Sequence, residues 1–157
     1  MKLKFTKLHI VLEIISLAVL VGMIVHIILL WQGAPDTVAM HYGADGTADR
    51  MDSKGSMVFL PIMAAIIYGG ITLVEFFPTA WNVPAVPEGK KTKMYSATRT
   101  MVILLKVEVV AAFWYIAGMM LTGKNLGGAF LPIELGLVFG TLVLYLVYVN
   151  RLKKREE

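Results

Sequence analysis

Four long runs of apolar residues, separated by polar segments, dominate the hydropathy pattern of the chain. The runs are Ile10–Trp31, Met57–Phe77, Thr100–Leu121 and Leu131–Val149. Each has about 20 residues, enough for an α-helix to cross a hydrocarbon core of about 30 Å. A helix satisfies its own backbone hydrogen bonds in lipid, and the sequence lacks the alternating segments typical of a membrane β-barrel. The pattern therefore predicts an all-α fold, a bundle of four transmembrane helices in a single domain over residues 1–157.

Composition supports the membrane interpretation and excludes several kinds of chemistry. The chain is 57% hydrophobic and 17% charged, whereas soluble domains are about 45–50% apolar and about 25% charged. The first apolar run is longer than the apolar core of a cleaved signal peptide, so we expect it to remain as a helix. With no cysteine in the sequence, disulfides, thiolate catalysis and cysteine-based zinc sites are excluded.

The distribution of basic residues predicts the orientation of the bundle. Eleven of the 15 Lys and Arg residues lie in the amino terminus, the second loop and the carboxyl-terminal tail. Three lie in the other two loops, and Lys106 lies within the third helix. Because cytoplasmic loops carry the excess of positive charge, we expect both termini in the cytoplasm and the first loop outside. The basic clusters then face the lipid surface, and we expect no nucleic-acid binding.

The first loop, residues 32–56, is acidic and is the most informative polar stretch. It contains four aspartates and one histidine. A calcium loop starting at Asp45 would need Gly at its sixth position and Glu at its twelfth, but Arg50 and Ser56 stand there. An EF-hand is therefore excluded. A looser metal site made of His41, Asp45 and Asp49 is one alternative.

The other alternative gives the acidic side chains of this loop a structural role. They would hold the loop in shape through Asx turns and through an ion pair with Arg50 or Lys54. Gly43 and Gly46 can adopt positive φ, so the chain can turn tightly between them.

The same loop resembles the outer loop of an uncharacterised bacterial membrane domain that opens the Sdp-type immunity proteins. The matching positions, in order, are His41, Gly46, Asp49, Ser53, Lys54 and, at the following helix, Pro61. Three positions depart from the family pattern: Val38-Ala39 replaces an apolar-Pro pair, Gly43 replaces an Asn, and Asp52 replaces a Gly.

The resemblance implies a non-enzymatic role in resisting or sensing a secreted killing factor. The first five matching residues would then form a recognition loop for a peptide toxin or another membrane protein. Family members have further membrane helices after this domain, whereas this sequence has four apolar runs in all.

Several ionisable residues fall inside the predicted helices, where a charge near the bilayer centre costs about 2.5–3.5 kcal/mol on insertion scales. Glu13 and Glu75 lie near the cytoplasmic ends of their helices, where we expect interfacial positions. Lys106 and Glu108 lie deeper and, being two residues apart, point to different faces of one helix. Lys106 would extend to the interface or pair with Glu75 or Glu13. Glu108 would face the interior as a polar clamp or as part of an ion or proton relay.

A histidine and a glycine pair complete the candidate features of the membrane part. His26 is expected to be neutral and hydrogen-bonded, and a shared outer site with His41 and Glu134 is an alternative. Gly136 and Gly140 form a small-xxx-small face, which would seat the fourth helix in the bundle or drive homodimerisation.

The leading interpretation is a non-enzymatic, multi-pass protein of the bacterial cytoplasmic membrane. The sequence shows no catalytic triad order, H-E-x-x-H motif or phosphate-binding loop, and we expect no cofactor. The runner-up is a small transporter or an accessory membrane subunit that uses Lys106 and Glu108.

Overall fold

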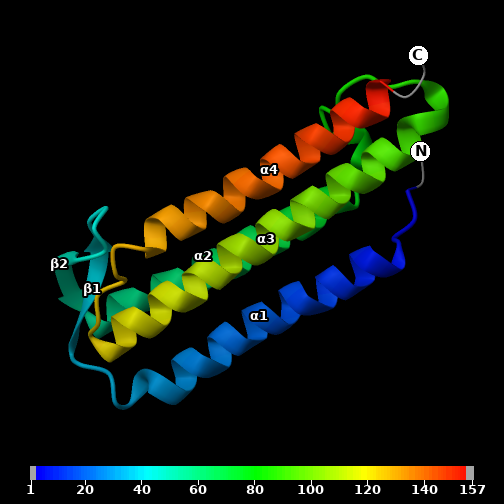
Figure 1. Cartoon of the computed structure of the whole chain (residues 1–157). Coiled ribbons are helices and arrows are strands. Elements are labelled where there is room, and N and C mark those ends of the chain that lie inside the picture. Colours follow the sequence, from blue (N-terminus) through cyan, green and yellow to red (C-terminus); the bar gives the residue numbers. More distant parts are fainter. Residues whose placement is uncertain (1–2, 155–157) are drawn as a thin grey trace.

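The computed structural model describes residues 3–154, which form a bundle of four helices and one β-hairpin (Figure 1). The helices are α1 (Lys7–Trp31), α2 (Phe59–Glu75), α3 (Lys91–Thr122) and α4 (Phe130–Lys154), and the strands are β1 (Thr37–Tyr42) and β2 (Ala48–Ser53). Short 3-10 turns cover Lys54–Val58, Pro78–Ala80 and Glu88–Lys90. All four helical segments are long and apolar enough to cross a membrane, so the prediction of four candidate spans is confirmed.

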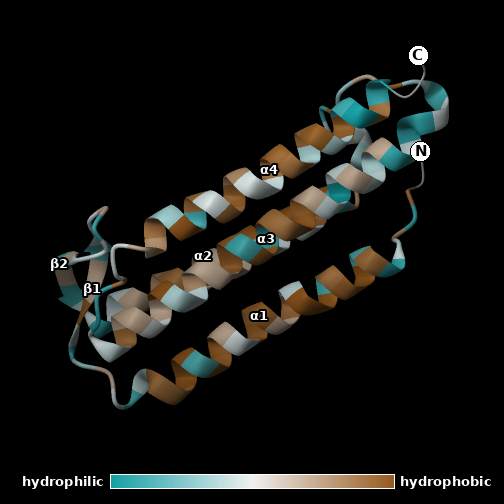
Figure 2. Cartoon of the chain, in the orientation of Figure 1, coloured by the Kyte–Doolittle hydropathy of each residue, from teal (hydrophilic) through white to brown (hydrophobic). Residues whose placement is uncertain are grey.

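The central helix of the bundle is α3, which packs against α1, α2 and α4. The first and last described residues lie at one end of the bundle, and the hairpin lies at the other (Figure 1). Figure 2 shows apolar residues along the helices and polar residues gathered at these two ends. Many large apolar side chains face outward, as expected for helices whose solvent is lipid.

Three helix ends lie well outside the predicted apolar runs: the starts of α1 and α3, and the end of α4, which is Lys154 instead of Val149. Helix α1 begins at Lys7 because Thr6 caps it: the Thr6 hydroxyl accepts from the His9 N–H at 3.2 Å. Helix α3 begins at Lys91, nine residues before the apolar run that starts at Thr100. At 1.5 Å per residue its 32 residues span about 48 Å, and its polar first turns extend beyond a hydrocarbon core.

The acidic first loop is a two-stranded antiparallel sheet, so the fold is mostly rather than entirely helical. Val38 and Ala39 of β1 are buried, whereas every residue of β2 is exposed. The chain reverses at Gly46, which has φ of +76°. The register slips on either side of His41, which is paired with Arg50. The sequence prediction did not include this hairpin, because its strands are too short to form a long apolar run.

Candidate functional site

A buried cluster of charged residues lies where α1, α2 and α3 meet. The ammonium group of Lys106 donates to both carboxylate oxygens of Glu13, at 2.9 and 2.8 Å, and to the hydroxyl of Thr72 at 2.9 Å. Its Nζ also lies 2.9 Å from Oε1 of Glu75 and 4.9 Å from the ring centre of Tyr68. Lys106 therefore pairs with both carboxylates that the sequence analysis offered as alternatives.

The two glutamates of this cluster differ in exposure. The Glu75 side chain is 0% exposed and the Glu13 side chain 22% exposed. Glu75 ends α2, as the sequence indicated, but its side chain turns inward to Lys106 instead of extending to solvent. Its carboxylate oxygens have no directed hydrogen bond in the described part of the chain, so its contact with Lys106 is an ion pair. Two carboxylates thus face one ammonium group, and either would be costly to bury alone.

A second buried cation, Arg99, ties the amino-terminal segment to the bundle. Its Nη1 donates to the carbonyls of Leu3 and Lys4 at 3.1 and 3.3 Å, and its Nη2 donates to the carbonyl of Glu75 at 3.0 Å. The guanidinium carbon lies 4.1 Å from the ring centre of Phe5. The sequence analysis treated Arg99 as one more cytoplasmic cation. Its position next to an apolar run was the available signal for burial.

His9 links α1 to α3 and is held in a neutral form. The Thr6 N–H, which can only donate, is bonded to Nδ1 of His9 at 3.2 Å, so Nδ1 carries no proton. The Nε2 atom lies 3.1 Å from both the Ser96 carbonyl and the Thr100 hydroxyl. It is therefore the protonated nitrogen and donates to the carbonyl. Sequence reasoning placed His9 outside the first helix and missed this contact.

Glu108 faces a different helix from Lys106, as their spacing predicted. Its Oε1 accepts from the hydroxyl of Thr141 on α4 at 2.5 Å. Its Oε2 is buried and has no hydrogen-bond partner among the described residues. Lys106 and Glu108 therefore do not form one joint site. They make separate polar contacts on opposite sides of α3.

His26 also has a specific partner on α3. The indole N–H of Trp114 donates to its Nδ1 at 2.9 Å, so this ring nitrogen is the acceptor of the contact. Gly22 leaves the space for this indole: a Cβ there would lie 2.6 Å from Cη2 of Trp114. Because His26 bonds to Trp114 and His41 to Asp49, the alternative of a site shared with Glu134 finds no support.

The hairpin presents one polar pair and one tight turn. Nδ1 of His41 lies 2.6 Å from Oδ1 of Asp49, and both side chains are exposed. Asp45 forms the expected Asx turn, because its Oδ1 accepts from the N–H and the hydroxyl of Thr47 at 3.0 and 2.8 Å. The backbone bond, followed by the hydroxyl bond, lowers the pKa of the Asp45 carboxyl below its ordinary value. No three His, Asp or Glu residues in 3–154 are grouped as metal ligands, so the geometry does not favour the metal alternative.

Lys54 fastens the hairpin to the end of α1. Its ammonium group donates to the carbonyls of Trp31 and Ala34 at 3.1 and 3.3 Å, and it lies 5.4 Å from the centre of a Trp31 ring. The expected ion pair between this lysine and a loop aspartate is replaced by these carbonyl contacts. A cation at a helix carboxyl end satisfies carbonyls that have no helical partner. The neighbouring Ser53 lies 3.2 Å from the Ser56 hydroxyl.

The tip of the hairpin rests on the loop between α3 and α4. The Leu126 N–H donates to the Gly46 carbonyl at 2.8 Å, and the Ala48 N–H donates to Oδ1 of Asn125 at 3.0 Å. A Cβ at Gly46 would lie 2.5 Å from the carbonyl oxygen of Gly127. Gly46 is therefore required both for its positive φ and for this close approach.

Comparison with known proteins identifies one segment. Residues 18–65 match a domain of unknown function, DUF1648. This DUF1648 segment covers less than a third of the chain and contains most of α1, the whole hairpin and the start of α2. It includes the six positions from His41 to Pro61 that carried the sequence resemblance, so the prediction of an uncharacterised domain is confirmed here. No curated protein and no solved structure matches the chain significantly.

Proposed function

We propose that this protein is a non-enzymatic, multi-pass protein of the bacterial cytoplasmic membrane that recognises a secreted peptide toxin through its hairpin, as Sdp-type immunity proteins would. The observation that carries the proposal is the DUF1648 segment, which coincides with the hairpin and the two helices that hold it. Lys54 and Gly46 secure the hairpin to the bundle, and the exposed His41–Asp49 pair is free to face a ligand. Anchors that fix the hairpin beside an exposed polar pair suit a recognition element on a rigid scaffold.

The proposed orientation places the hairpin outside the cell and both termini in the cytoplasm. It rests on the excess of Lys and Arg at the end of the bundle opposite to the hairpin. Ser53 on the hairpin and Gly89 in the opposite loop are exposed, and the native sequence has no cysteine. In intact cells a membrane-impermeant maleimide should label Ser53→Cys and leave Gly89→Cys unlabelled. The opposite labelling pattern would reverse the topology.

The immunity role is tested in cells that lack the gene. Mutant cells are grown in medium conditioned by the parent bacterium, and their survival is compared with that of complemented cells. We expect survival to fall on deletion and to remain low with His41→Ala or Asp49→Ala at unchanged protein levels. Asp36→Ala, an exposed aspartate outside the strand pair, is the matched control and should restore survival. If deletion leaves survival unchanged, the immunity proposal fails.

A second candidate is a small transporter or an accessory membrane subunit. The buried cluster around Lys106 favours it, because two carboxylates facing one ammonium group inside a membrane are typical of ion or proton pathways. Flux measured in proteoliposomes should then fall with Glu75→Gln or Glu108→Gln. Flux that neither substitution changes would remove this candidate.

The face formed by Gly136 and Gly140 favours a homodimer over a seat within the bundle. A Cβ at either glycine would meet no atom within 4 Å in residues 3–154, so no other helix of this part of the chain covers the face. We propose that two copies meet through α4. Crosslinking in vesicles should show a dimer that Gly136→Leu reduces, whereas Gly69→Leu on α2, which is equally open, should not.

A further inference from the structure

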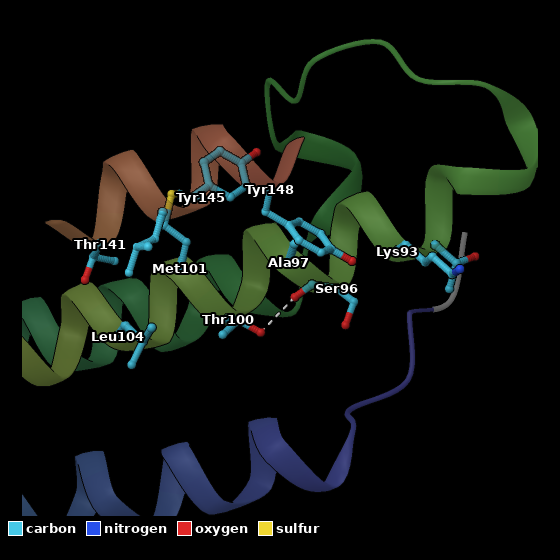
Figure 3. Close-up of a pocket in the computed structure, with 11 residues that line it drawn as sticks. Lys93, Ser96, Ala97, Thr100, Met101, Leu104, Thr141, Tyr145 and Tyr148 are labelled. Carbon is cyan, nitrogen blue, oxygen red and sulfur yellow. Dashed lines mark hydrogen bonds between the residues drawn. The ribbon is translucent and has the colours of Figure 1, made fainter. Parts of the chain in front are cut away.

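A groove of about 500 Å³ lies between α3 and α4, in the half of the bundle that carries the two ends of the chain (Figure 3). Its floor on α3 includes Ala97, Met101 and Leu104, and its wall on α4 includes Leu144 and Tyr148. The groove lies within the size range of small-molecule sites, about 300–1,000 Å³. The lining is mainly apolar, so the groove suits an apolar ligand.

The groove runs along the helices. Figure 3 shows Lys93 at one end of the row of lining residues and Leu104 at the other. Eleven residues of helical rise separate them, which corresponds to about 17 Å. This is close to half of a hydrocarbon core of about 30 Å, the depth of a single leaflet. The groove therefore runs from the polar first turns of α3, on the membrane surface, into the apolar part of the bundle that begins at Thr100, as a lipid does.

The interfacial end of the groove is positively charged. Lys93 is exposed and belongs to the lining. On α4 the lining residues Leu144 and Tyr148 are four residues apart and lie on one face of the helix. Arg151, three residues after Tyr148, lies on the same face and is exposed. Each of the two helices thus places a cation at the same end of the groove. At a membrane surface, the negatively charged group that complements these cations is a lipid phosphate.

The wall of the groove is held in place by hydrogen bonds. The hydroxyl groups of Tyr145 and Thr98 lie 3.0 Å apart across the α3–α4 contact, and Thr98 also donates to the Met94 carbonyl. Within the lining itself, the Thr100 hydroxyl donates to the Ser96 carbonyl at 3.1 Å (Figure 3). The groove is therefore preformed, which lowers the entropy lost when a flexible chain binds.

We propose that this groove binds one anionic phospholipid from the leaflet at the end of the bundle that carries the termini. One acyl chain lies between α3 and α4, and the phosphate lies beside Lys93 and Arg151. The proposal does not depend on toxin recognition, because its residues lie at the opposite end of the bundle from the hairpin.

The test is native mass spectrometry of the delipidated full chain. The protein, in a neutral detergent, is titrated with phosphatidylglycerol or with phosphatidylcholine carrying identical acyl chains. We expect one tightly bound phosphatidylglycerol, favoured over phosphatidylcholine by about fivefold or more. Ala97→Phe, which fills the floor, should abolish this first binding event. Ala65→Phe on the exposed face of α2 is its matched control and should leave binding intact.

Two double variants distinguish the contribution of the lipid headgroup to binding from that of the acyl chain. Lys93→Gln with Arg151→Gln should make the two lipids bind equally. Lys124→Gln with Arg50→Gln removes the same charge at the opposite end and should retain the preference. Because these four side chains are exposed, the comparison remains decisive if Ala97→Phe does not fold. Equal binding of both lipids to the unaltered protein, or an equal loss with the opposite-end pair, would overturn the proposal.

Discussion

The Nζ atom of Lys106 on α3 lies 2.9 Å from Oε1 of Glu75 on α2, and both side chains are fully buried. Glu13 on α1 completes the contact from the other side. Three of the four helices are therefore joined by one charged group, in a region where water cannot replace a missing partner. We therefore expect substitutions in this cluster to lower the stability of the bundle most.

Lys106→Met should destabilise the protein strongly. It leaves two carboxylates facing each other without a cation, and breaking a buried ion pair costs about 3–5 kcal/mol. The free energy of unfolding in detergent measures the effect. Lys124→Met, at an exposed position, is the control and should change it little.

The same cluster predicts non-additive rescue. Adding Glu13→Gln and Glu75→Gln to Lys106→Met removes the uncompensated charges, so the triple variant should be more stable than the single variant. If the triple variant is instead less stable than Lys106→Met, and its loss equals the sum of the losses of the three single variants, the charges do not interact.

Gly22→Ala should destabilise the contact between α1 and α3. The new Cβ would lie 2.6 Å from Cη2 and 2.9 Å from Cζ3 of Trp114. Because the indole is bonded to His26, it cannot move away without losing that bond. We expect a loss of about 1–3 kcal/mol, seen as a lower Tm. Gly70→Ala, which has open space around it, should leave Tm unchanged or raise it, and equal losses at both positions would contradict the steric explanation.

Lys54→Gln should loosen the carboxyl end of α1. The substitution removes the ammonium group that binds the carbonyls of Trp31 and Ala34, with an expected loss of about 1–2 kcal/mol. Hydrogen exchange should become faster for amides in the last turn of α1. Arg50→Gln removes the same charge from the hairpin and should leave this exchange unchanged.

The turn at the tip of the hairpin should weaken in acid. Hydrogen bonds from Thr47 lower the pKa of Asp45 in the folded protein, so the ionised carboxylate stabilises the turn above its unfolded pKa, which is about 3.9. That stabilisation is lost as pH falls through the lower folded pKa. A carboxyl titration by NMR should place Asp45 below its ordinary value and show a rise with Thr47→Val. Thr37→Val, at the start of β1, should not move it.

The number of membrane-spanning helices was predictable because every segment that crosses lipid must be an unbroken apolar helix. The end of α1 at Trp31 was identified correctly on that ground. The start of α3 was not, because its first turns are polar and lie beyond the apolar run. Those turns are helical through tertiary contacts: Met94 is buried and Arg99 binds three carbonyls from other segments.

The partners of the ionisable residues were predictable only where spacing constrained them. The spacing of Lys106 and Glu108 showed that they face apart, and the structure adds which helix each one meets. The partners of His9 and Lys54 are backbone carbonyls, which carry no sequence signal. The hairpin had one signal, the tight turn around Gly46, because its first strand does not alternate: Val38 and Ala39 are both buried. The pattern of long apolar helices carries no information about this hairpin.

The position of Lys106 on the third helix has a consequence for biogenesis. Ribosomes deliver the chain from its amino end, so α1 and α2 reach the bilayer carrying Glu13 and Glu75 before their cation has been synthesised. Until α3 arrives, the half-made protein holds two carboxylates near the lipid without a counterion. Synthesis of the third span is therefore the step that supplies the counterion for both carboxylates.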